Sequence, residues 1–105
     1  MTEAQLKDSL QDETYAFPSP YSPNVHGTVF FVFDNKTAGN AELTIFDFAL
    51  DQVYQVQKTF AVSDGSMFQW DGLDDDGEYP ANGIYMFRII AADGFEHWGK
   101  LAIIK

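Results

Sequence analysis

The chain has 105 residues with a formal net charge of −10, from 16 acidic and 6 basic residues, and it contains no cysteine. This length suits one domain with one hydrophobic core, and a chain that is 46% hydrophobic and 16% aromatic favours a folded, strand-rich structure. The negative charge excludes nucleic acid as a partner, because its phosphates need a basic surface, and the lack of cysteine excludes disulfides, zinc–thiolate sites and a cysteine nucleophile. No run approaches the ~20 apolar residues of a membrane-spanning helix, so membrane insertion is not expected.

Residues 1–14 are polar and acidic, and we interpret them as a flexible linker or an added segment outside the domain, which we place at residues 15–105. They contain no basic stretch followed by an apolar run, so they are not a secretory signal peptide. Two alternatives remain at this point: a cytoplasmic protein, or a fragment of a longer chain that begins at an added Met1.

The proline-rich stretch of residues 17–24 cannot form a central strand, because proline lacks the N–H that a strand ladder needs; we expect an edge segment. The Asp64-Gly65 and Asp93-Gly94 pairs that follow are typical of hairpin turns. Their spacing from other turn residues predicts an all-β, immunoglobulin-like antiparallel sandwich of about seven strands. The expected strands after the proline-rich stretch are residues 28–33, 42–47, 52–62, 67–70, 84–91 and 95–104.

The strand expected at residues 84–91 is apolar on both faces. Tyr85 and Phe87 lie on one face, and Met86, Arg88 and Ile90 on the other. Because an unpaired arginine is costly to bury, we assign the Tyr85 face to the core. Met86 and Ile90 then lie near water, either as a contact surface or covered by a loop or by side-chain stems. The residues expected between the two sheets are Ile45, Trp70, Tyr85 and Phe87.

Six short motifs follow one another in a specific order between residues 17 and 105. They are Phe17-Pro18-Ser19-Pro20-Tyr21-Ser22-Pro23, Thr28-Val29-Phe30-Phe31-Val32, Leu43-Thr44-Ile45-Phe46-Asp47, Trp70-Asp71-Gly72-Leu73-Asp74-Asp75-Asp76-Gly77, Gly83-Ile84-Tyr85-Met86-Phe87-Arg88 and Lys100-Leu101-Ala102-Ile103-Ile104-Lys105. In this order they resemble the immunoglobulin-like domain of the flagellar hook-capping type. They closely resemble the C-terminal sorting domains carried by cargo of the bacterial type IX secretion system. One departure is clear: the family usually has a glycine where this chain has Leu50-Asp51, so the turn there is expected to differ in type.

The resemblance implies a non-catalytic module for sorting and surface attachment at the C-terminus of a larger secreted protein. It favours the fragment alternative, with the signal peptide upstream and a secreted or cell-surface location. It implies as partners a protein of the secretion machinery or cell surface, and the upstream domains of the same polypeptide. The last strand is where we expect recognition, because an edge strand offers free N–H and C=O groups that a receptor can extend. The candidate recognition residues are Lys100, Leu101, Ile103, Ile104 and Lys105.

No catalytic residues are expected. His26 and His97 are isolated, with no second His or Cys at the spacing of a metal site. Ser66 could be combined on paper with His97 and an acid. It lacks, however, the strand-to-helix elbow and the glycine pattern that mark a hydrolase nucleophile.

The acidic loop of residues 71–83 has the composition of a calcium site, since calcium prefers clustered carboxylate and carbonyl oxygens. The candidate calcium ligands are Asp71, Asp74, Asp76 and Glu78. An EF-hand does not fit, because glycines fall where its first and last ligands belong when Gly77 takes the sixth position. We favour the alternative in which Asp71 and Asp74 accept backbone N–H groups in tight turns while the other acids, Asp75 among them, are solvated. No cofactor or metal is then expected.

Aromatic side chains raise a different function, because flat rings can stack on sugars. The candidates are Tyr21, Trp70, Tyr79 and Trp98; Trp70 is expected in the core and Trp98 on the surface. The sequence therefore leaves two alternatives to sorting. One is an accessory polysaccharide-binding domain of a secreted enzyme, and the other a structural module that assembles with copies of itself.

Overall fold

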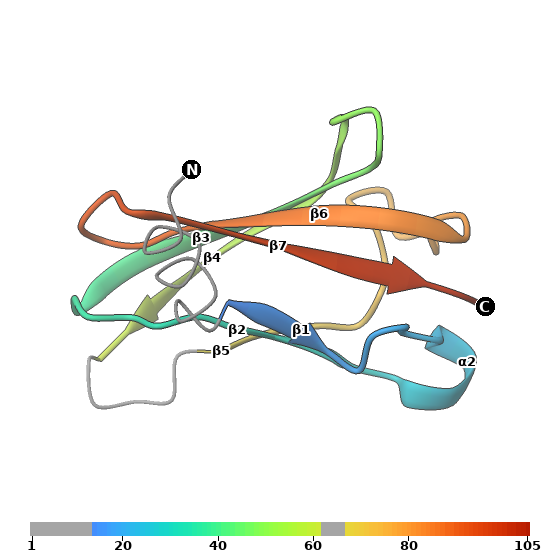
Figure 1. Ribbon diagram of the computed structural model, residues 1–105, viewed down its shortest axis with the longest axis horizontal. Helices are drawn as coiled ribbons and strands as arrows, with labels where there is room; N and C mark the ends of the chain where they lie inside the picture. Colours follow the sequence, from blue (N-terminus) through green and yellow to red (C-terminus); the bar gives the residue numbers. More distant parts are fainter. Residues whose placement is uncertain (1–13, 62–66) are drawn as a thin grey trace, which may run out of the picture.

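The structure is a computed structural model that describes residues 14–61 and 67–105, and within these ranges it has seven strands and one short helix (Figure 1). The elements are β1 (Tyr15–Phe17), α2 (Pro23–His26), β2 (Val29–Val32), β3 (Gly39–Phe46), β4 (Gln52–Phe60), β5 (Met67–Trp70), β6 (Gly83–Ile90) and β7 (Glu96–Ile103). The all-β prediction is confirmed. No helix in the described part of the chain is long and apolar enough to cross a membrane.

The strands form two antiparallel sheets that face each other as a sandwich (Figure 1). One sheet has the strand order β1-β2-β5, and the other has the order β4-β3-β6-β7. The chain changes sheet between β2 and β3, between β4 and β5 and between β5 and β6. β1 is an edge strand that pairs with β2 alone, and of the proline-rich residues 17–24 it contains only Phe17. Farther along that stretch, Tyr21 forms an isolated bridge with Ile103 at the edge of the other sheet, as expected of an edge segment.

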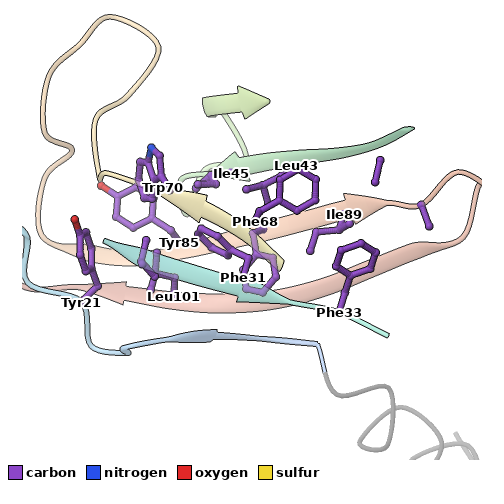
Figure 2. Packing of buried hydrophobic residues seen from close by; sticks show 14 of the residues in the cluster. Tyr21, Phe31, Phe33, Leu43, Ile45, Phe68, Trp70, Tyr85, Ile89 and Leu101 are labelled. Atoms are coloured by element: carbon purple, nitrogen blue, oxygen red, sulfur yellow. The ribbon is translucent and has the colours of Figure 1, made fainter. Parts of the chain in front are cut away.

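The core lies between the two sheets and is dominated by aromatic rings (Figure 2). Phe31 of β2 meets Phe87 of β6 edge-on, with ring centroids 4.8 Å apart, so this pair joins the sheets. All four residues predicted to be buried are confirmed. The buried hydrophobic residues are Tyr21, Val29, Phe31, Phe33, Ala41, Leu43, Ile45, Phe60, Phe68, Trp70, Tyr85, Phe87, Ile89, Ala91, Leu101 and Ile103.

The two faces of β6 are those predicted. Tyr85, Phe87 and Ile89 point into the core, whereas Met86 and Arg88 alternate with them on the outer face and are only partly buried. Arg88 is not left unpaired there, since its guanidinium carbon lies 5.4 Å from the Phe46 ring centroid and 5.8 Å from that of Trp98. These contacts let a charged residue lie on a largely apolar sheet face.

The structure differs from the sequence expectation at several points. β3 begins at Gly39, three residues before the strand expected at residues 42–47, and the short helix α2 was not predicted. The hairpin at Asp93-Gly94 is confirmed, but the ladder ends at Ile90 and Glu96 and only Gly94 has a positive φ, of 86°. This is a three-residue loop, since the Gly94 N–H bonds the Ala91 carbonyl and the Ala91 N–H bonds the Phe95 carbonyl. The Asp64-Gly65 turn and Val62 lie outside the described residues, as do residues 1–13.

The turn between β3 and β4 holds Leu50 in a backbone conformation that favours glycine. Leu50 has a φ of 66°, in the left-handed region that glycine adopts without strain. The Asp47 carboxylate holds the turn closed by accepting the N–H groups of Ala49 and Asp51, both at 2.9 Å. The turn therefore strains Leu50, because an L-residue in this region crowds its own backbone. Whether its type differs from that of the resembled domains stays a prediction.

Replacing Leu50 by glycine should stabilise the domain. A left-handed L-residue costs about 1–2 kcal/mol, and the added freedom of glycine in the unfolded chain takes back about 0.5–1 kcal/mol, so we expect a gain of about 0.5–1 kcal/mol in the free energy of unfolding. Urea denaturation measures it. Phe48→Gly is the matched control, because Phe48 is also exposed in this turn but has no positive φ. An equal gain from both variants would argue against strain at Leu50.

Candidate functional site

The acidic loop after β5 is built by side-chain-to-backbone hydrogen bonds. Asp71 Oδ1 accepts the N–H of Leu73 at 3.1 Å, and Asp74 Oδ1 accepts the N–H groups of Asp76 and Glu78 at 2.9 Å each. Trp70 Nε1 donates to the Leu73 carbonyl at 2.7 Å, which ties the loop to the core. The turn-shaping role predicted for both aspartates is therefore present.

Asp75 has a role that the sequence did not indicate. It was expected to be solvated, but its carboxylate accepts the backbone N–H of Gln55 at 3.3 Å and the Gln52 amide at 3.1 Å, although the side chain is exposed. Its own N–H donates to the Val53 carbonyl at 3.0 Å. The loop thus closes the open edge of β4 over these residues, and such pairing blocks strand addition there.

That no calcium binds at the candidate ligands Asp71, Asp74, Asp76 and Glu78 stays a prediction. In residues 14–61 and 67–105, no three His, Asp or Glu side chains gather as a metal site. Millimolar calcium should therefore leave the melting temperature nearly unchanged. A calcium site would instead stabilise the folded domain by about 2.7 kcal/mol when the calcium concentration is about a hundred times its Kd. A rise of several degrees that EGTA reverses would favour a metal site.

The five candidate recognition residues of the last strand separate into two groups. Leu101 and Ile103 are fully buried in the core, so they hold the fold together. Lys100 and Lys105 are exposed, and Ile104 is 53% exposed. The Lys105 N–H donates to the Asn82 side chain at 2.9 Å, which fixes the end of the chain against the start of β6. Only Lys100, Ile104 and Lys105 can present side chains to a partner.

The backbone edge of β7 is not free at its C-terminal end. Tyr21 pairs with Ile103 in a parallel bridge, donating its N–H to Ala102 O at 2.7 Å and accepting the Ile104 N–H at 2.9 Å. Ser19 Oγ accepts the Ala102 N–H at 3.3 Å. A receptor therefore cannot extend the sheet at residues 102–104 unless the Tyr21 segment leaves first, which corrects the expectation that this edge is open.

Tyr21 itself was a candidate for sugar stacking, and that interpretation is wrong, because its side chain is fully buried. Its hydroxyl lies 2.8 Å from the Gly27 carbonyl and 3.1 Å from the Asp71 carbonyl, and burial raises the pKa of the phenol, with smaller contributions from Tyr79 and Asp71. The prolines of this segment lack an N–H, so pairing with a strand edge falls to the residues between them, but the sequence does not indicate which one or which edge.

The other sequence candidates are dispersed. Trp70 is buried as predicted, whereas Tyr79 and Trp98 are about half exposed. His26 Nδ1 accepts the N–H of Ser22, which precedes α2, at 2.9 Å. His97 is buried against Phe33 and Phe95, with Thr14 Oγ1 3.4 Å from its Nδ1. Ser66 lies outside the described residues. A shallow hollow beside His97 is lined by Asp34, Lys36, Ala91, Asp93, Phe95 and His97.

Solved structures that share this fold include PorZ and PorU. PorZ, described as an essential bacterial surface component of the type IX secretion system of Porphyromonas gingivalis, is 21% identical with a TM-score of 0.69, and the match covers 92% of this chain and 12% of PorZ. Dimeric latent PorU from the same bacterium is 20% identical with a TM-score of 0.65, and the match covers 87% of this chain and 9% of PorU. At these identities the likeness shows the fold, over a small part of each neighbour. No family model matches the sequence, and no curated protein matches it significantly.

Proposed function

We propose that this domain is a non-catalytic C-terminal module of a longer secreted bacterial protein, read by the type IX secretion machinery for export and surface attachment. The order of the six sequence motifs supports this function. The shared fold with PorZ and PorU supports it further. PorZ is a surface component of that secretion system, PorU comes from the same bacterium, and the match covers 12% of PorZ and 9% of PorU.

The observation that carries the proposal is what the last strand displays. β7 anchors the fold through buried Leu101 and Ile103, while Lys100 and Lys105 extend into water on a chain of net charge −10. A receptor with an acidic surface would bind these two lysines in preference to the rest of the acidic domain, because complementary charge selects partners and speeds their encounter. With Tyr21 already paired to residues 102–104, we propose recognition through these side chains rather than through strand addition.

Export of a reporter tests the proposal. Residues 15–105, fused behind a signal peptide and a fluorescent protein, should bring the reporter to the surface of a host with type IX secretion. Lys100→Gln combined with Lys105→Gln should abolish surface delivery while leaving the domain folded, because such surface changes usually alter stability by less than about 0.5 kcal/mol. Surface fluorescence and periplasmic fractionation measure the outcome.

The matched control removes the same two charges elsewhere. Lys36→Gln combined with Lys58→Gln changes exposed lysines of the β2–β3 connection and of β4, so export should continue. Deleting residues 100–105 is a poorer test, since it removes two core side chains and unfolds the domain. If the reporter with the unaltered domain stays in the periplasm, sorting is the wrong function for this chain.

A further inference from the structure

The outer face of the four-stranded sheet carries a flat aromatic surface that the proposed sorting function does not use. Trp98 of β7 and Phe46 of β3 stack above β6 with ring centroids 5.9 Å apart and planes inclined by 22°. Arg88 of β6 contacts both rings, and its Nη1 lies 3.8 Å from Glu96 Oε1. We call these residues, Phe46, Arg88, Glu96 and Trp98, the Trp98 platform.

The platform is rigid yet accessible. Trp98 is contacted by the stacked Phe46 ring and by the Arg88 guanidinium over its ring, and Arg88 lies directly opposite it in the β6–β7 ladder. The indole is nevertheless 45% exposed, and the Glu96 side chain is 51% exposed. A ring already fixed in place loses little conformational entropy when a ligand lies on it, which favours binding.

The polar groups beside the indole indicate the class of ligand. An Arg–Glu pair offers guanidinium donors and carboxylate acceptors side by side, and a sugar hydroxyl is both a donor and an acceptor. The Arg88 side chain is 27% exposed, and its Nη1 lies 3.8 Å from Glu96 Oε1, too far for a hydrogen bond, so this ion pair leaves both groups able to bond sugar hydroxyls. We infer that the Trp98 platform binds an uncharged polysaccharide, with one sugar ring on the exposed indole and its hydroxyls bonded to Arg88 and Glu96.

The charge of the molecule selects against acidic polymers. The chain carries a net charge of −10, and at the platform Glu96 balances the charge of Arg88. An acidic polysaccharide would therefore meet general repulsion without a free cation at the ring. An uncharged glycan meets neither obstacle and uses both partners of the ion pair.

Native affinity electrophoresis of the full 105-residue chain tests the inference. The gels contain laminarin, xylan, glucomannan or pullulan as uncharged polymers, and alginate as the acidic one. At least one uncharged polymer should retard the protein, alginate should not, and Trp98→Ala should weaken binding at least about tenfold, which corresponds to about 1.4 kcal/mol. Glu96→Ala, which leaves the aromatic stack in place, should weaken it at least about threefold.

Phe95→Ala is the matched control, because Phe95 is a 59% exposed aromatic residue of the same hairpin that does not belong to the platform. Its binding should equal that of the unaltered chain. Circular dichroism establishes that each variant is folded, and Glu96→Ala keeps the test decisive if Trp98→Ala does not fold. Retardation by no uncharged polymer, retardation by alginate alone, or full binding after both platform substitutions would overturn the inference. None of these outcomes bears on export, which is measured separately.

Discussion

Tyr21→Ala should lower the free energy of unfolding by about 4 kcal/mol, the loss typical of a fully buried aromatic residue. The ring is completely buried beside Trp70, with centroids 6.5 Å apart, so its removal leaves a cavity in the core. The substitution also removes the hydroxyl that bonds the carbonyls of Gly27 and Asp71. Urea denaturation measures the loss, which for a domain of this size can amount to much of its stability.

Two comparisons separate the contributions of Tyr21. Tyr21→Phe keeps the ring and removes the hydroxyl, so it should cost about 1–2 kcal/mol. Tyr79→Ala, at a half-exposed tyrosine of the acidic loop, should cost less than about 0.5 kcal/mol. Hydrogen exchange gives the local result: the Ile104 amide, which bonds the Tyr21 carbonyl, should lose protection in Tyr21→Ala. A loss of stability below 1 kcal/mol would mean that this segment does not hold the end of β7.

Gly99→Ala should destabilise the domain by about 2–3 kcal/mol, although alanine normally suits a strand better than glycine. Gly99 lies opposite Phe87 in the β6–β7 ladder, and the space of its missing side chain is filled by the Phe87 ring. A Cβ would collide with ring atoms of Phe87, which is fully buried and packs edge-on against Phe31. Because the ring is buried, the ring, the strand or the core around it must shift to make room.

A double-mutant cycle identifies the collision as the cause. In a Phe87→Leu background the smaller side chain leaves room, so Gly99→Ala should cost less than about 0.5 kcal/mol there. Thermal or urea unfolding of the four proteins gives the coupling energy. Equal costs of Gly99→Ala in both backgrounds would show that the Phe87 ring is not the reason why residue 99 is glycine.

Alternation along single strands was sufficient to predict much of the architecture. The faces of β6 follow from the cost of burying Arg88, and β5 was predicted with its observed bounds. Asp71 and Asp74 were also predicted correctly as turn residues, because their hydrogen bonds join neighbours in the chain. What these predictions share is that the deciding interaction is local in sequence.

The features that the sequence did not indicate join distant segments. Tyr21 covers the edge of β7 from 82 residues away, Asp75 closes the edge of β4, and Phe46, Arg88 and Trp98 meet only because β3, β6 and β7 are neighbours in one sheet. The sequence alone determined the all-β class, the core faces and the local turns, since period-two alternation and turn chemistry depend on adjacent residues. Only the tertiary structure decided which strand edges are closed and which aromatic rings reach the surface together, because strand order brings together residues whose separation in the chain carries no pattern.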